Sequence, residues 1–182
     1  NGGVFRPNQP NYADNGPLHA GKLFVHEGGF RIPFMMQWPG HIEAGKVYHQ
    51  PVSSMDILPT ALAVAGGKPP TDRPMDGVDL MPFVTEKKKS APHEFLAWRL
   101  GQNHALRKGD WKLLQYGENP PKLFNLADDL SETKDLAAIA SDKLKELTQL
   151  YAQWESGMKP AVYRAREPIP LTYEGQSIVL DF

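Results

Sequence analysis

The sequence contains no cysteine among its 182 residues. A disulfide framework, thiolate-bound zinc, an iron–sulfur cluster and a thiol nucleophile are therefore excluded. An excess of basic charge is also missing, because 20 Lys and Arg face 21 Asp and Glu, for a formal net charge of −1. A general nucleic-acid-binding surface needs such an excess, so no nucleic-acid partner is expected. No apolar run approaches the roughly 20 residues of a membrane helix, so no membrane span is expected.

Several motifs of known chemistry are absent as well. The sequence has neither a Gly-x-Ser-x-Gly elbow nor a phosphate-binding P-loop. The pair His26-Glu27 starts like a metalloprotease motif, but the second His would fall at position 30, which is Phe. The six histidines show no close metal-ligand spacing. They are therefore interpreted as surface or hydrogen-bonding residues rather than zinc ligands.

What is present indicates a packed protein, with 41% hydrophobic and 23% charged residues. In the first half, residues 34–38 are a short apolar run before Pro39-Gly40, which predicts a buried strand. Ser53 or Asp56 as an N-cap and Gly66 at the far end predict a short helix between them. Its apolar stripe would consist of Ile57, Leu58, Ala61, Leu62 and Ala65.

The second half shows a different pattern. Strands are predicted at 95–99, 105–107, 111–114 and 122–126, with a hairpin turn at Gly109. Ser141 is predicted to cap a helix over 141–155 with an apolar face of Leu144, Leu147, Leu150, Tyr151 and Trp154. This order favours a small α+β unit in which one helix covers an antiparallel sheet.

The charged run before Pro92 suggests a domain boundary. The predicted organisation is one domain over 1–92, a small α+β subdomain over 93–157 and an irregular tail over 158–182.

The most distinctive stretch for chemistry is Gly21–Pro33. A Lys after a Gly turn, here Lys22, can present its ammonium group to an anionic substrate. Gly28 and Gly29 permit close approach of a chain or ligand. Composition alone favours a solvated Lys22 and a structural ion pair between Glu27 and Arg31.

Four blocks in this order resemble the sulfatase family of the alkaline-phosphatase superfamily: Asn1-Gly2-Gly3, Pro17–Lys22, Glu27–Pro33 and Gln37–Gly40. The resemblance continues through Gln50–Thr60, Asp76–Leu80, Leu106–Leu113 and Leu123–Leu126, and so covers about residues 1–157. It implies the C-terminal fragment of a bacterial-type, arylsulfatase-like sulfuric-ester hydrolase. The implied fold class is α/β, with α+β character in this chain. Residues 1–92 would be the C-terminal part of the large α/β catalytic domain, and the small sheet and helix would follow it.

The resemblance also implies site residues. Lys22 matches a Lys that contacts the sulfate group, and Asn1 matches the Asn of an Asp-Asn pair in a calcium site. The nucleophile of the family is formylglycine, made from Cys or Ser in a Cys/Ser-x-Pro-x-Arg motif. This chain has no Cys and no Ser-x-Pro-x-Arg, so the nucleophile would lie outside it and the chain alone is expected to be inactive. His26 and His19 replace residues that are commonly aromatic and Arg.

The expected substrate is an aryl sulfate or a sulfated carbohydrate, and the expected location is periplasmic or secreted, as for many relatives. Two alternatives remain open. One is a phosphoester hydrolase of the same superfamily with a Thr or Ser nucleophile. The other is a non-catalytic sulfatase-like binding module, in which Lys22 would be an ordinary surface cation.

Overall fold

A computed structural model describes residues 2–6, 10, 13–160 and 168–180. The chain divides into two compact units. The sheet unit comprises residues 1–33 with 97–182, and the helical unit comprises residues 34–96. Within the described residues, no helix combines the length and apolar character needed to cross a bilayer.

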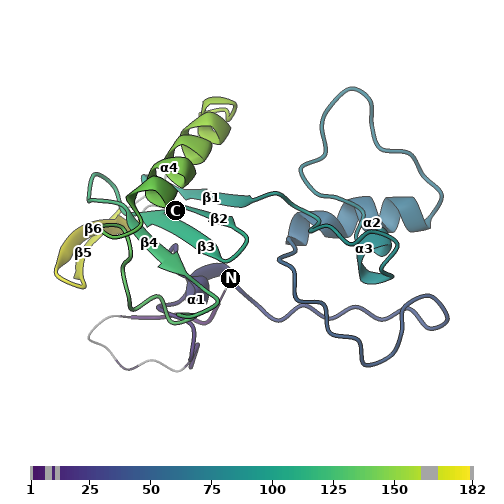
Figure 1. Ribbon diagram of the computed structural model, residues 1–182, viewed down its shortest axis with the longest axis horizontal. Helices are drawn as coiled ribbons and strands as arrows, with labels where there is room; N and C mark the ends of the chain where they lie inside the picture. The colour runs from purple at the N-terminus through teal and green to yellow at the C-terminus, as the bar shows by residue number, and fades with distance from the viewer. Residues whose placement is uncertain (1, 7–9, 11–12, 161–167, 181–182) are drawn as a thin grey trace. The chain divides into compact units, whose positions relative to one another are not determined.

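The sheet unit is built around four strands in the order β1-β2-β3-β4 (Figure 1). Their bounds are β1 Leu96–Leu100, β2 Asn103–Lys108, β3 Trp111–Gln115 and β4 Lys122–Asn125. β2 and β3 are antiparallel and joined by a tight turn in which Gly109 has a φ of 59°. Only glycine adopts that backbone region at little cost. The predicted strands and hairpin are therefore confirmed.

Strand register separates the sheet into two faces. Leu106, Leu113 and Leu123 lie directly opposite one another across three strands, and all are fully buried. Because opposed residues share a face, they form one apolar row. Helix α4 (Ser141–Ser156) packs on β2 and β3 and buries Leu147 and Tyr151 (Figure 1). The helix was predicted, but Ala140 and not Ser141 is its N-cap, without a side-chain capping bond.

The opposite face of the sheet carries a second apolar cluster. Ala105, Leu114 and Phe124 belong to this cluster, together with Phe24 and Val25 from the N-terminal segment. A hairpin completes it, formed by β5 (Ile169–Tyr173) and β6 (Gln176–Leu180).

An irregular tail was predicted over residues 158–182, and the hairpin corrects that prediction for residues 169–180. Residues 161–167 and 181–182 of the predicted tail lie outside the described residues. Prolines 168 and 170 obscured the strand signal because proline is disfavoured in strands. The signal that the sequence does carry is the period-2 placement of Ile178 and Leu180, whose side chains are buried on one face of β6. The assignment of residues 1–92 to a catalytic domain stays a prediction. In this structure residues 1–33 cluster with the sheet rather than with residues 34–96.

The helical unit contains three short helical elements, namely η1 Ser54–Asp56, α2 Ile57–Val64 and α3 Met81–Val84 (Figure 1). The predicted helix start is confirmed, because Ser53 and Asp56 form a reciprocal capping box. The predicted apolar stripe is not buried here, since Ile57 and Leu58 are 53% and 66% exposed.

The predicted buried strand over residues 34–38 is wrong for this structure. No strand is assigned there, and Met35 is 90% exposed. A strand requires a neighbour for its backbone groups, and among the described residues none pairs with this segment. The mixture of helices and antiparallel sheet nevertheless agrees with the predicted α/β class, α+β within this chain.

Asp56 holds the helical unit together. Its fully buried carboxylate accepts hydrogen bonds from the Ser53 and Val78 amides at 2.7 and 2.9 Å and contacts His93 Nε2 at 2.9 Å. Thr60 extends this network by donating to the Asp56 carbonyl and accepting from the Leu80 amide. The helix start and the 78–80 loop therefore share one buried anchor.

We expect Asp56→Ala to destabilise the helical unit by about 3 kcal/mol or more, because buried donors lose their charged acceptor. Hydrogen exchange would show this as lost protection of the Val78 amide. Asp72→Ala is the control, since Asp72 is exposed and bonds to Arg73. Equal protection in the two variants would contradict the anchoring role.

Candidate functional site

Lys22 lies on a tight turn with an exposed side chain. Its backbone amide donates to the Gly3 carbonyl at 2.9 Å, and Val4 and Lys22 form an isolated parallel bridge. Ala20 and Leu23 both have positive φ, 56° and 82°. Such angles are uncommon for residues other than glycine, and here they bend the chain sharply on both sides of Lys22. No described side chain pairs with its ammonium group.

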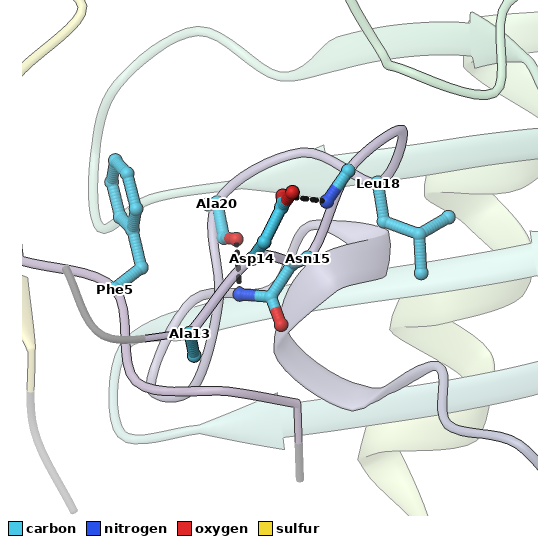
Figure 2. Close-up of a pocket in the computed structure, with 7 residues that line it drawn as sticks. Phe5, Ala13, Asp14, Asn15, Leu18 and Ala20 are labelled. Atoms are coloured by element: carbon cyan, nitrogen blue, oxygen red, sulfur yellow. Dashed lines mark hydrogen bonds between the residues drawn. The ribbon is translucent and has the colours of Figure 1, made fainter.

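The side chain of Asn15 holds this turn together by hydrogen bonds, which the sequence did not predict. Its Nδ2 donates to the carbonyls of Gly3 and Ala20, at 3.1 and 3.0 Å, and its Oδ1 accepts from the Gly3 amide at 2.8 Å. Figure 2 shows the amide group reaching the Ala20 carbonyl. An Asn in a turn-rich segment is a candidate for hydrogen bonds to the backbone. The partners of Asn15 are five and twelve residues away, so local sequence does not identify them.

A pocket lies beside this turn and is lined by Phe5, Ala13, Asp14, Asn15, Gly16, Leu18 and Ala20 (Figure 2). Among the described residues that line the pocket, the acidic Asp14 is the charged one. An anionic ligand would be repelled there, so this pocket is not a suitable sulfate site. The exposed ammonium group of Lys22 is better suited to bind an anion such as sulfate.

Gly28 and Gly29 allow the N-terminal segment and the Lys22 turn to pack closely. The Gly2 amide donates to the Gly29 carbonyl at 3.0 Å, and the Gly28 amide donates to the His19 carbonyl at 2.9 Å. A Cβ on Gly28 would collide with the carbonyls of His19 and Ala20. The predicted close approach is thus an approach of backbone to backbone.

Helix α1 (Glu27–Phe30) follows the Lys22 turn in the chain and begins with a buried acidic residue, Glu27. Glu27 Oε1 lies 3.0 Å from Lys112 Nζ, and Lys112 Nζ lies 2.7 Å from Glu132 Oε1. The Glu27 amide donates to Glu132 Oε2 at 2.6 Å. The side chains of these three residues are at most 1% exposed, so the network is cut off from water.

Two arginines complete the charge balance around Glu27. Its Oε2 lies 3.3 Å from Arg107 Nη1 and 3.4 Å from Arg31 Nη1. The structural ion pair predicted for Glu27 and Arg31 is confirmed. Arg107 and Lys112 are directly opposed across β2 and β3, so both reach the same face. Neither role was predicted from the sequence.

Burial controls the proton affinities in this region. It raises the pKa of Glu132, although the Lys112 ammonium opposes that shift. It lowers the pKa of His26 well below its ordinary value, and the nearby Lys112 acts in the same direction. His26 Nδ1 lies 2.9 Å from the hydroxyl of Tyr116, whose pKa burial raises. His26 is therefore a neutral ring at pH 7.

Of the two predicted site residues, the structure places Lys22 as described above, whereas Asn1 lies outside the described residues. The adjacent Gly2-Gly3 segment pairs with the Lys22 turn and with Gly29. The predicted calcium site stays a prediction.

The family of this chain follows from its similarity to known proteins. Residues 19–158 match the family described as "N-sulphoglucosamine sulphohydrolase, C-terminal". The chain belongs to the sulfatases. It corresponds to their C-terminal region, as the sequence blocks predicted.

Individual sulfatases agree with this assignment. The chain is 34% identical over 171 residues to mouse N-acetylgalactosamine-6-sulfatase, covering 93% of this chain and 31% of the relative. It is 37% identical over 120 residues to rat steryl-sulfatase, covering 59% of this chain and 20% of the relative. The crystal structure of Ps i-CgsB in complex with k-i-k-neocarrahexaose superposes with a TM-score of 0.70 at 33% identity, covering 78% and 32% of the two chains. The chain thus spans about a third of the mouse relative and of this neighbour.

We predict that Lys112→Met destabilises the sheet unit by about 3–5 kcal/mol, because it leaves two buried carboxylates without their shared cation. Denaturant unfolding measures the change. Lys143→Met is the matched control: Lys143 pairs with Glu146 on the surface of α4, with both side chains at least one-third exposed, so its loss should cost about 1 kcal/mol or less. Similar losses in both variants would contradict a special role for the buried network.

A second prediction concerns pH. In the native chain His26 stays neutral below pH 6.5, whereas the unfolded chain binds a proton there. Stability contributed by His26 is therefore present above pH 6.5 and lost as the pH falls toward the lowered native pKa, by at most about 1.4 kcal/mol per pH unit.

His26→Phe, which keeps a ring but cannot titrate, should flatten the fall in unfolding free energy between pH 6.5 and 5. His49→Ala removes an exposed histidine and should leave the slope as it is. An unchanged slope in His26→Phe would show that other groups control acid stability.

Proposed function

We propose that the protein containing this chain hydrolyses sulfate esters and that Lys22 binds the sulfate group. The supporting observation is an exposed ammonium group, without a described partner, on a turn clamped by Asn15. A rigid turn lowers the ordering cost of binding, and the sulfatase family makes sulfate the suitable anion.

The chemistry fits a cation at this position. Cleavage of a sulfate ester builds negative charge on the leaving oxygen while the non-bridging oxygens remain anionic. A preorganised ammonium group stabilises that charge with little reorganisation during the reaction. Lys22 would thus orient the sulfate and stabilise its charge, while Asn15 holds the turn that carries the lysine.

The remaining catalytic groups would come from outside the described residues. By resemblance, calcium would neutralise charge on the sulfate oxygens, and the amide carbonyl of Asn1 is an oxygen ligand of the kind that calcium prefers. The nucleophile would be a formylglycine supplied by another part of the protein, so this chain alone would be inactive. An exported location, periplasmic or secreted, stays part of the proposal.

We further propose a sulfated carbohydrate rather than a simple aryl sulfate as substrate. The support is that one relative is named for N-acetylgalactosamine-6-sulfate chemistry and a structural neighbour was crystallised with neocarrahexaose. Both observations concern those proteins, and a carbohydrate substrate for this one is our inference from them.

The test is Lys22→Ala in the longest protein that contains this chain, assayed on a sulfated oligosaccharide and an aryl sulfate. We expect kcat/KM to fall by about 10²–10³, the usual effect of removing one charge-stabilising donor. Lys22→Arg should recover part of the activity because it restores a cation. Lys145→Ala, which removes an exposed lysine on α4, should be fully active.

Three outcomes would contradict the proposal. Unchanged kcat/KM in Lys22→Ala would make Lys22 an ordinary surface cation. Turnover of phosphate esters but not sulfate esters would favour the phosphoester hydrolase. Absence of both activities in a protein without an upstream Cys/Ser-x-Pro-x-Arg motif would favour a non-catalytic binding module.

A further inference from the structure

A cluster of metal-ligating side chains lies in the sheet unit, apart from the network around Glu27. His19, His26 and Glu174 each offer one ligand atom, and these three atoms lie within 4.8 Å of one another. The two imidazole rings are stacked, with centroids 4.4 Å apart and planes at 25°. The three residues come from the Lys22 turn, the start of α1 and the β5–β6 turn, so only the folded chain brings them together.

The hydrogen bonds of His19 prepare it to bind a cation. Its Nδ1 lies 2.8 Å from the Ser131 carbonyl, which can only accept, so Nδ1 carries a proton. Its Nε2 lies 2.8 Å from Glu174 Oε1. A bare nitrogen lone pair facing a carboxylate oxygen is repulsive. Either a proton or a metal ion must therefore lie between these two atoms.

His26 supplies the second, independent observation. It is 1% exposed, and none of the residues that the structure describes offers its Nε2 a hydrogen-bond partner. A buried polar atom without a partner is costly and requires an explanation. Its other nitrogen is held by the Tyr116 hydroxyl at 2.9 Å, as the second nitrogen of a metal-bound histidine usually is. Metal binding through Nε2 requires the tautomer in which Nδ1 donates to Tyr116.

Glu174 can serve as a ligand without giving up its existing cation. Its Oε2 pairs with Lys122 Nζ at 2.9 Å, which leaves Oε1 for the ion beside His19. Its side chain is 35% exposed and that of His19 is 18% exposed. Both can therefore adjust, whereas His26 is fixed by burial.

We propose that His19, His26 and Glu174 form a binding site for a transition-metal ion, with Zn²⁺ as the representative. Two imidazoles and one carboxylate are a ligand set that zinc accepts, with bonds of about 2.0–2.2 Å and a fourth position open to water. Ligand atoms around such an ion lie about 3.4 Å apart. The most distant pair must therefore approach by up to about 1.4 Å, whereas His19 Nε2 and Glu174 Oε1, which are 2.8 Å apart, must separate by about 0.6 Å. A rotation of the His19 ring would allow both changes. Nitrogen ligands distinguish this site from an oxygen-rich calcium site.

The test is calorimetric titration of the chain with zinc chloride, together with thermal unfolding with and without zinc. We expect one zinc per chain and a higher Tm in its presence, because the folded state alone assembles the site. His19→Ala and Glu174→Gln should each weaken binding by tenfold or more. Tyr116→Phe should weaken it by about 10–100-fold through the orientation of His26.

His49→Ala is the matched control and should bind zinc as the unchanged chain does, because His49 is exposed and belongs to the helical unit. Glu174→Gln guards against misfolding, since it alters only an exposed residue and keeps nearly the same shape. Unchanged zinc affinity in both His19→Ala and Glu174→Gln would overturn the proposal. Equal loss in His49→Ala would overturn it too. In either case a proton, and not a metal ion, would lie between His19 Nε2 and Glu174 Oε1. Because the measurement is metal binding, its outcome is independent of the sulfatase activity.

Discussion

The buried ammonium of Lys112 is the interaction on which the sheet unit depends. It lies between the carboxylates of Glu27 and Glu132, which are 105 residues apart in the chain. Removal of three charged groups from water is costly and is tolerated only when each has partners of good geometry. The network therefore specifies one position for helix α1 against strand β3. Because the Lys22 turn lies only five residues before Glu27, the network also fixes where this turn lies on the sheet unit.

The Lys22 turn combines a firmly held backbone with an exposed ammonium group. The carbonyls around Lys22 are occupied by backbone amides and Asn15, so the turn has little freedom to move. Its ammonium group nevertheless faces solvent. Preorganisation of this kind is what charge stabilisation requires. The helical unit is held in a comparable way, by the buried carboxylate of Asp56, although its apolar stripe on α2 is exposed.

Local signals predicted most of the regular structure. The capping box at Ser53, the glycine turn at Gly109 and the apolar spacing of α4 each act over a few residues, so each is legible in the sequence. The predictions that went wrong depended on distant partners. Residues 34–38 have strand composition but no described neighbour to pair with, and the β5–β6 hairpin was obscured by its prolines.

The sequence by itself determined the family, through ordered blocks around Lys22 and Glu27, and with it the expectation of an anion-binding lysine. Only the tertiary structure decided that Arg107 and Lys112 meet Glu27, because strand register places side chains from two strands on one face. The same holds for His19, His26 and Glu174. Their separation in the chain resembles no metal motif, and only the folding of β5 and β6 against the N-terminal segment brings them within reach of one ion.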